Sequence, residues 1–540
     1  MALLEIAKKS LLTAEKYSAL NSLISVQSQL GLFSQIQASQ ERIHAGNLPY
    51  FLLTTALCQP SDTGESKSPI DGHLIAVKDN ICTIDFPTTC ASKLLEQYTS
   101  PFDATIVRKV KDAGAVIMGK TNMDEFGMGS HSMYSHFGPV MQSANDGQPA
   151  RSAGGSSGGS AVAVATGMCY ASSLECCWGV TLSFTPVELW EPTLVAQFAS
   201  QPLIVELLDS NLRMECCPGG GWLLMQTHWT QSEYLGEISQ ASKSYMVSYG
   251  FRTFHLTGLM FTDTINGHDD DDPTSITPQA RERIQDRLSR SRRKGRRLVI
   301  GYPEEFNLVE LDDSVRNAWE NTLSHLSLQS HRIVAVSLPH TKHALSAYYV
   351  LAPAEASSNL AKYDGVRYGY RDPDDRSEDG LLFSPTRANF GAEVRRRIIA
   401  GAYSLSSEAI NNYFLKAQSA RRVIQHDFSN AFAQPNYLVT DNPEEGRGGG
   451  EGVDVLIAPT SLSKAPFLED VKMQKSPLDS YVNDVLTVPA SLAGIPAICL
   501  PVVHGEKGSV GMQVMAQYGD EEMMWEVAKI IEDGLGSKLE

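Results

Sequence analysis

Short apolar runs that alternate with helical stretches dominate the hydrophobic pattern of this chain. Residues 1 to about 50 carry Leu and Ile at helical spacing and predict helices packed on a core, and residues 160–166 predict a buried helix of small residues. Further apolar runs predict strands, with their turns, at 74–78, 116–122, 300–306, 453–460 and 509–514. A helix that opens at Thr105 and ends at Ala113-Gly114-Ala115 precedes the second of these. Such alternation predicts an α/β fold with a site at the strand ends.

The 540 residues are enough for a large core, and we expect a single domain spanning 1–540. Within it, residues 441–452 are rich in Gly and Glu and predict a disordered loop. Residues 172–258 form an anomalous segment, because four of the six Trp and four of the nine Cys fall between 171 and 232.

Composition excludes several classes of function. Lys plus Arg 45 against Asp plus Glu 62 gives 45 − 62 = −17, which argues against broad binding of nucleic acid by this chain alone. The nine Cys show neither metal-binding spacing nor a secreted disulfide pattern, and no apolar run reaches the length of a membrane span. His268 followed by four Asp suggests a metal ligand set, but we favour a structural turn ending in D-P-T-S.

The glycine-rich stretch from Arg151 to Thr166 is the first candidate for chemistry. Gly154-Gly155 and Gly158-Gly159 flank Ser156-Ser157, and the chain then enters the predicted buried helix. Glycine permits close approach of backbone to ligand, and amide groups at a helix start can stabilise an oxyanion. A flexible linker is the alternative, but linkers continue in polar residues.

Lys78 is the second candidate, at the end of the strand L-I-A-V-K-D-N. A lysine in a dry pocket loses the hydration of its charged form and can act as a base. Taken alone, Lys78 is more simply explained as a solvated strand end.

Together, the two stretches resemble the amidase signature family, whose Ser–cis-Ser–Lys triad uses the lysine of A-V-K-D-N and the first serine of G-G-S-S-G-G-S. The resemblance places the lysine at Lys78 and the bridging cis-serine at Ser156, so we expect Lys78 Nζ and Ser156 Oγ within hydrogen-bond reach. It also implies the amidase-signature fold, with a mixed, mostly parallel central sheet between helical layers.

Two further motifs narrow the resemblance. M-D-E-F-G-M-G at 123–129 and A-P-A-E-A-S-S-N-L at 352–360 are similar to the family branch formed by the A subunits of glutamyl-tRNA(Gln) amidotransferases. In that branch, the basic run in F-G-A-E-V-R-R-R-I at 390–398 implies that Arg396 meets the carboxylate of glutamine. Asp484 would hold the α-ammonium. A run of three Arg is otherwise a solvated helix face.

The resemblance implies a glutaminase with partners. A neutral Lys78 takes the proton of Ser156, which relays it from a nucleophilic serine that attacks the side-chain amide of glutamine. The ammonia passes to the B subunit, which uses ATP and Mg²⁺ to activate glutamate on Glu-tRNA(Gln), while the amidase subunit itself needs no cofactor or metal. The branch also implies a small accessory subunit, and for a eukaryotic gene it implies the mitochondrial matrix.

The nucleophilic serine is missing from the sequence as written. The family places it in L-G-T-D-T-G-G-S-(V/I)-R, at a spacing that falls on Val180, and no such motif occurs. Codons formed from the last base of one residue and the first two of the next do permit this motif within residues 188–231. Trp and Met have single codons, and the shifted residues that they determine agree with the family.

We therefore expect residues 188–231 to be an out-of-frame translation, with the serine codon straddling Ala196 and Gln197. The flanks, 172–187 and 232–258, resemble translated intron and imply a eukaryotic, fungal type of gene. A genuine insertion that replaced the site is the alternative.

Two other functions compete with the glutaminase subunit. A stand-alone amidase for small or lipid amides would share Lys78 and Ser156, although the motif at 352–360 argues against it. The chain as written lacks the nucleophilic serine, so taken literally it is a catalytically inactive scaffold subunit.

Overall fold

The structure is a computed structural model of the chain. It describes residues 3–45, 66–142, 149–175, 193–198, 245–250, 268–269, 276–291, 297–376, 383–438, 452–474, 476, 478–503 and 510–535. All but the last residue of the predicted loop 441–452 lies outside these ranges, as does most of the segment 172–258.

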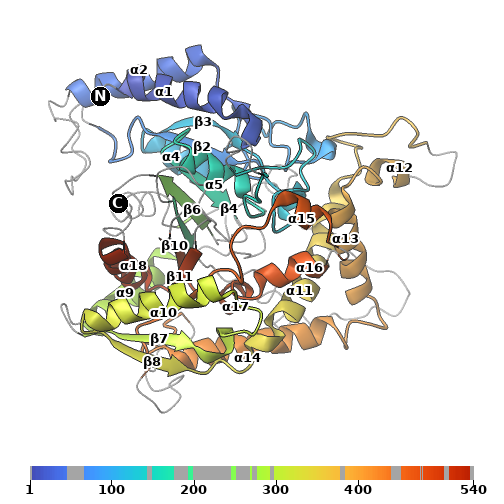
Figure 1. Cartoon of the computed structure of the whole chain (residues 1–540). Coiled ribbons are helices and arrows are strands. Elements are labelled where there is room, and N and C mark those ends of the chain that lie inside the picture. The colour runs from blue at the N-terminus through green and yellow to red at the C-terminus, as the bar shows by residue number, and fades with distance from the viewer. Residues whose placement is uncertain are drawn as a thin grey trace.

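The described strands form one sheet in the order β1-β3-β2-β4-β6-β5-β10-β11-β9-β7-β8. The strands are β1 (Leu23–Val26), β2 (Leu74–Lys78), β3 (Val116–Thr121), β4 (Ala171–Glu175), β5 (Thr193–Phe198), β6 (Tyr245–Gly250), β7 (Val299–Pro303), β8 (Arg332–Val336), β9 (Val455–Pro459), β10 (Ala497–Val503) and β11 (Val510–Ala516). Helices pack around the sheet (Figure 1), which confirms the predicted α/β class.

The helices named in Figure 1 have the following bounds. They are α1 (Leu3–Lys16), α2 (Gln29–Ala45), α4 (Thr105–Asp112), α5 (Gly158–Ala165), α9 (Pro278–Ser291), α10 (Asp313–Leu328), α11 (Ala344–Asn359), α12 (Ser384–Arg387), α13 (Ala392–Ser404), α14 (Phe414–Ala431), α15 (Leu468–Lys472), α16 (Leu478–Tyr481), α17 (Val488–Ala493) and α18 (Glu521–Leu535). Short 3₁₀ turns that matter for the site are η3 (Glu125–Gly127) and η8 (Val482–Asp484). None of the helices in the described ranges has the length and apolarity that crossing a membrane requires.

The sheet is mixed, as expected, but the expectation of mostly parallel pairing is wrong for the described strands. Parallel pairs join β3-β2-β4 and β9-β7-β8, whereas the other pairs are antiparallel. The β10–β11 pair shows the physical reason. Only a short connection separates Val503 from Val510, which permits an antiparallel partner but not the longer crossover that parallel strands need.

Strands β2 and β3 are buried on both faces, and β2 ends at the candidate residue Lys78. Side chains of a strand alternate between faces. Ile75, Val77 and Ile117 therefore enter the main core under α4, whereas Leu74 and Met118 enter a second core. That second core lies beneath α1 and α2, which run side by side along this edge of the sheet (Figure 1).

One element of the N-terminal region differs from the expectation. Residues 1 to about 50 predict helices, and α1 and α2 confirm this on either side of β1. Leu23–Val26 is instead an edge strand that pairs antiparallel with β3. Four residues are too few for an alternating pattern to outweigh the helical spacing around them, so this strand depends on tertiary pairing.

Candidate active site

Lys78 and Ser156 meet in the interior. Lys78 ends β2, and Ser156 lies two residues before the start of α5 at Gly158. The two residues are 0% and 3% exposed. Lys78 Nζ donates a hydrogen bond of 2.9 Å to Ser156 Oγ, and the Gly155–Ser156 peptide bond is cis. The expected contact is therefore present, while the catalytic roles of both residues stay a prediction.

The glycine-rich turn uses much of its backbone for internal packing. Three of its amide groups already have acceptors: Gly154 N–H donates to Ser152 Oγ, Gly158 N–H to Ser132 Oγ and Gly159 N–H to the Asn122 carbonyl. A Cβ added at Gly155 would lie 2.5 Å from Asp124 Oδ2. These three amides are therefore already paired with protein acceptors, and the expectation that the turn stabilises an oxyanion stays a prediction that falls on its other amides.

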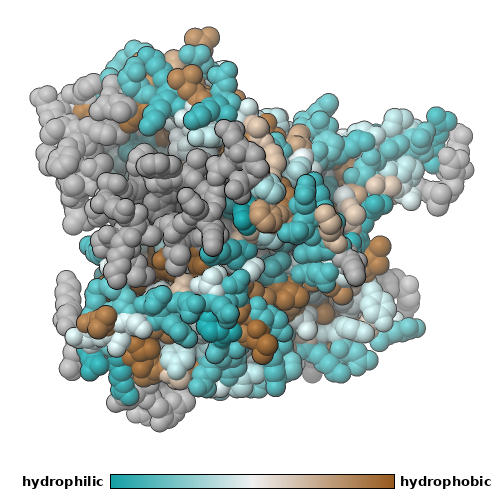
Figure 2. All heavy atoms as spheres, viewed as in Figure 1, coloured by the Kyte–Doolittle hydropathy of each residue, from teal (hydrophilic) through white to brown (hydrophobic). Residues whose placement is uncertain are grey.

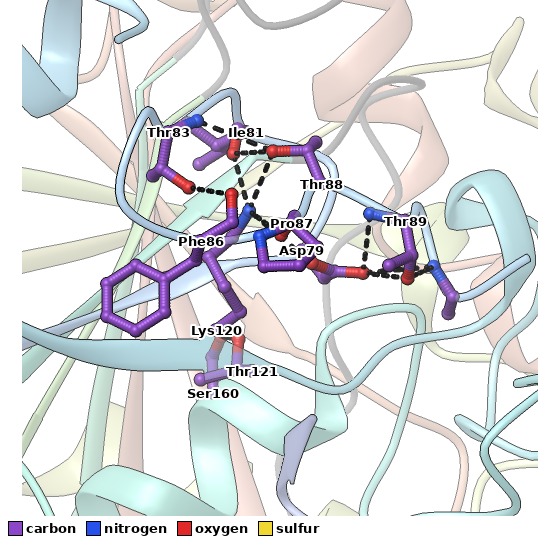
Figure 3. A network of polar contacts seen from close by, with 11 residues as sticks. Asp79, Ile81, Thr83, Phe86, Pro87, Thr88, Thr89, Lys120, Thr121 and Ser160 are labelled. Atoms are coloured by element: carbon purple, nitrogen blue, oxygen red, sulfur yellow. Dashed lines mark hydrogen bonds and ion pairs between the residues drawn. The ribbon is translucent and has the colours of Figure 1, made fainter. Parts of the chain in front are cut away.

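A second buried lysine, Lys120 of β3, anchors the loop that follows Lys78 (Figure 3). Its Nζ donates to the Ile81 carbonyl at 2.8 Å and to Thr88 Oγ1 at 3.1 Å, and it lies 3.4 Å from Asp79 Oδ1. Burial raises the pKa of Asp79, and the Lys120 ammonium opposes that effect. Lys120 is therefore a structural cation, a role that the sequence pattern did not indicate.

Asp124 packs against the glycine-rich turn and is fully buried. Its backbone N–H donates to the Ser156 carbonyl at 3.0 Å, and its carboxylate accepts the N–H groups of Ser132 and Tyr134, both at 2.9 Å. Burial raises the pKa of Asp124 to about 6, against the effect of these N–H groups. Asp124 thus ties the M-D-E-F motif to Ser156.

Glu125 turns the opposite way and contacts the helical layer. Its carboxylate accepts Ser92 Oγ at 2.5 Å and the Gly391 N–H at 2.7 Å, directly before α13 begins. Burial raises the pKa of Glu125 to about 7. The two acidic residues of M-D-E-F therefore connect Ser156 on one side with α13 on the other.

Asp484 is buried at the end of η8 and carries the predicted ammonium-binding carboxylate. Tyr349 of α11 donates to Asp484 Oδ2 at 2.7 Å, and Ser130 Oγ donates to the same oxygen at 3.0 Å. Burial raises the pKa of Asp484 to about 6. Among the described residues both donors meet Oδ2, so Oδ1 is the oxygen that can meet a ligand.

The arginine run on α13 presents two different environments. Arg396 is 40% exposed and pairs with Glu393. Arg397 is 5% exposed, donates to the other Glu393 oxygen at 2.8 Å, and lies 5.2 Å from the ring centre of Tyr349. Its charge also lowers the pKa of Asp484 against the effect of burial. The structure therefore brings Arg397, rather than Arg396, to the surroundings of Asp484.

The expected position of the nucleophile, Val180, lies outside the described residues. Ala196 and Gln197, which would share the shifted serine codon, belong to β5, whose backbone pairs with β6 and β10. Of the acidic cluster after His268, the structure describes Asp269, which accepts a hydrogen bond from Thr105 Oγ1 on α4. In the described part of the chain, His, Cys, Asp and Glu side chains form no group of three that could hold a metal.

Comparison with known families gives a match to the amidase family model over residues 31–173 and 257–525. The interruption, 174–256, falls inside the segment 172–258 that composition sets apart.

Similar proteins share one name. The A subunit of the mitochondrial glutamyl-tRNA(Gln) amidotransferase from Tuber melanosporum is 73% identical over 538 residues, which cover 99% of this chain and 97% of that protein. The protein of the same name from Emericella nidulans is 45% identical, over 87% of this chain and 90% of its own length.

Solved structures agree with the sequence comparisons. The A subunit of the glutamyl-tRNA(Gln) amidotransferase from Thermotoga maritima superposes with a TM-score of 0.64 at 26% identity, covering 98% of this chain and 91% of that one. A crystal structure described as an amidase superposes with a TM-score of 0.65 at 20% identity, over 99% and 97% of the two chains, and shows the shared fold. With its buried Lys78–Ser156 pair and a family match that covers most of its length, this chain belongs to the amidase family.

Proposed function

We propose that this protein is the glutamine-hydrolysing A subunit of a mitochondrial glutamyl-tRNA(Gln) amidotransferase. It would supply the ammonia that converts Glu-tRNA(Gln) to Gln-tRNA(Gln). The observation that carries the proposal is the buried 2.9 Å hydrogen bond between Lys78 and Ser156. It occurs in a chain that is 73% identical, over 99% of its length, to a protein of that name.

The reaction is a proton relay coupled to acyl transfer. The nucleophilic serine attacks the side-chain carbonyl carbon of glutamine and gives its proton to Ser156, while the proton of Ser156 moves to neutral Lys78. Collapse of the tetrahedral intermediate breaks the C–N bond, and the returning proton leaves with ammonia. Water then attacks the acyl-enzyme, releases glutamate and restores both serines. General base catalysis of this kind contributes about 10²- to 10⁴-fold to the rate.

The region around Asp484 would recognise the α-ammonium and α-carboxylate groups of glutamine. Oδ1 of the Asp484 carboxylate would accept the α-ammonium of glutamine, since Tyr349 and Ser130 already donate to Oδ2. Arg397 is the better partner for the α-carboxylate than Arg396, because it lies near Asp484 and is shielded from water. Charge-assisted hydrogen bonds at both groups would orient the amide toward Ser156.

The product, ammonia, determines which partner proteins this subunit would need. Ammonia must reach a second protein, the B subunit, which would use ATP and Mg²⁺ to activate the glutamate of Glu-tRNA(Gln). The net charge of −17 agrees with a tRNA substrate held through that partner, and a small accessory subunit would complete the complex. We propose no cofactor for the amidase subunit itself.

Glutaminase activity requires the nucleophile that the printed sequence lacks. A triad without its nucleophile forms no acyl-enzyme, so the printed polypeptide is expected to be inactive. Restoring the shifted frame across residues 188–231 and removing both flanks would return the motif L-G-T-D-T-G-G-S-V-R. A scaffold role is the second candidate, favoured by the absence of this motif from the printed sequence.

The test compares the printed chain with the frame-restored chain, each assembled with the B subunit. We expect glutamine hydrolysis only by the restored chain, with stimulation by the B subunit, ATP and Glu-tRNA(Gln). Ser156→Ala in the restored chain should reduce kcat by at least about 10²-fold. Hydrolysis of simple amides without any response to the B subunit would favour a stand-alone amidase, and inactivity of both chains would favour the scaffold.

A further inference from the structure

Two consecutive residues after the M-D-E-F-G-M-G motif bind two consecutive residues at the end of η8. Ser130 Oγ donates to Asp484 Oδ2 at 3.0 Å, and Asn483 Nδ2 donates to His131 Nε2 at 3.1 Å. Ser130, His131 and Asp484 are each at most 4% exposed. We call this pair of contacts the 130–131/483–484 clasp.

The contacts of His131 define its tautomer. The Asn483 amide nitrogen also donates to the Ser480 carbonyl at 3.2 Å, which fixes the orientation of that amide. His131 Nε2 is therefore the acceptor, and the proton sits on Nδ1, which donates to Ser152 Oγ at 2.9 Å. Burial lowers the pKa of His131 to about 4, so the ring is neutral near pH 7 and can both donate and accept.

From the clasp, two short routes lead to Ser156. On the first, Ser152 Oγ also accepts the Gly154 N–H at 3.1 Å, two residues before Ser156. On the second, the Ser132 N–H binds the Asp124 carboxylate, and the Asp124 N–H binds the Ser156 carbonyl. The segment 130–132 thus contacts the surroundings of Asp484 and of Ser156 through hydrogen bonds that leave little freedom between them.

The clasp also decides which oxygen of Asp484 is available. Ser130 and Tyr349 both donate to Oδ2, and among the described residues Oδ1 receives no donor. An ammonium group that binds Oδ1 is therefore held at a fixed distance from Ser156. An amide substrate without an ammonium group gains nothing from this arrangement.

We propose that Ser130 and His131 are positioning residues that hold the Asp484 carboxylate in register with Ser156, and thereby make the site select amides that carry an α-ammonium group. The inference rests on the proposed glutaminase function, and neither residue contacts the reacting atoms. Their effect is on the preference for amides that carry an α-ammonium group over amides that lack it.

The test uses two variants of His131 that each keep one of its contacts. His131→Asn places an amide nitrogen near the position of Nδ1 and can keep the bond to Ser152, whereas His131→Gln places an amide oxygen near Nε2 and can keep the bond from Asn483. His136→Asn is the matched control, because His136 is 37% exposed and lies on the same loop. All are made in the frame-restored chain assembled with the B subunit.

The readout is kcat/KM for glutamine and for glutaramate, which is glutamine without its α-amino group. We expect both His131 variants to lower the ratio of kcat/KM for glutamine to that for glutaramate about tenfold, since each loses one of the two hydrogen bonds through which His131 links Asn483 to Ser152. The kcat/KM for glutaramate should stay within twofold of the parent value. That result would show that the variants fold. His136→Asn should leave both substrates unchanged.

Two results would overturn the inference. An unchanged ratio means that the clasp does not position Asp484, and an equal loss with both substrates means that His131 supports the fold only. If the parent complex hydrolyses no glutamine, the proposed function itself fails, and the inference fails with it.

Discussion

Two fully buried lysines on neighbouring strands have different surroundings. In the β2–β3 register, Val77 pairs with Lys120 and Lys78 with Thr121, so the two lysines leave the sheet at nearly the same level. Lys120 lies 3.4 Å from Asp79 Oδ1 and donates hydrogen bonds to the Ile81 carbonyl and to Thr88 Oγ1, contacts that hold the loop after β2. Lys78 meets the Ser156 hydroxyl, a group that can give up a proton. The neighbours, rather than the burial, distinguish the structural cation from the candidate base.

This contrast predicts different losses on substitution. Lys120→Met leaves Asp79 buried without its cationic partner and should lower the free energy of unfolding by about 3–5 kcal/mol. Lys78→Met removes the hydrogen bond to the neutral Ser156 hydroxyl and should lower that free energy by less than Lys120→Met does, yet reduce glutaminase activity of the frame-restored complex by about 10²- to 10⁴-fold.

Urea unfolding of the printed chain and glutamine assays of the restored complex measure the two effects separately. Equal losses of stability for the two variants would show that Lys78 is also a structural cation.

At this scale the sequence predicts some residues and misses others for physical reasons. Lys78 and Ser156 belong to motifs whose letters are distinctive, so their contact could be expected. Lys120 depends on acceptors that only the folded loop brings to it, and a single lysine in a strand carries no such signal. Three consecutive Arg point around a helix in different directions, so the sequence alone could not separate Arg396 from Arg397.

At the scale of elements, Glu125 couples η3 to the start of α13. Its carboxylate binds Ser92 and Gly391, and α13 then presents Arg397 to the surroundings of Asp484. A Cβ at Gly391 would lie 2.3 Å from Glu125 Oε2, so the two elements are in close contact. The start of α13 is therefore held by a buried carboxylate.

Glu125 should make stability depend on pH. Its pKa is raised from 4.5 to about 7 in the folded protein, so the native state binds more protons than the unfolded state between these values. The stabilisation is complete below pH about 4.5 and is lost as pH rises toward 7, by roughly 3 kcal/mol. Glu125→Gln should remove this part of the slope in urea unfolding measured from pH 4.5 to 7.5.

Glu96→Gln is the control for this measurement, because Glu96 has a half-exposed side chain. If Glu125→Gln shows the same pH dependence as the parent, Glu125 does not carry the raised pKa.

Elements were predictable where the sequence pattern is local. The all-buried run of α5 and the strands β2, β3 and β9 follow from short apolar runs with clear ends. The four-residue strand β1 and the antiparallel centre of the sheet were not predictable, since both depend on which strand lies next to which.

At the scale of the whole molecule, the match to the amidase family model is interrupted once, and the sequence on both sides of the interruption matches the family. The match ends at 173, resumes at 257, and leaves out the region where the nucleophile motif belongs. In the sheet, β5 and β6 lie between β4 and β10 and join the β1-β3-β2-β4 part to the rest. Most of the surface in Figure 2 that the structure describes is hydrophilic, as the net charge of −17 leads one to expect. The anomaly is thus confined to one segment.

The last prediction concerns the origin of that segment. An unrelated insertion has no reason to encode the missing motif in another frame, whereas retained intron sequence with a shifted frame would do so. We expect cDNA spanning codons 165–265 to lack the flanks 172–187 and 232–258 and to encode L-G-T-D-T-G-G-S-V-R directly.

Sequencing of the mature transcript provides the measurement, and glutamine hydrolysis by its product provides the control. A message that encodes Leu189-Trp190-Glu191-Pro192 in frame would contradict the prediction. If its product also hydrolysed glutamine and lost that activity on Ser156→Ala, Ser156 would itself be the nucleophile. Lys78 would then act on Ser156 directly, as the 2.9 Å contact between them already permits.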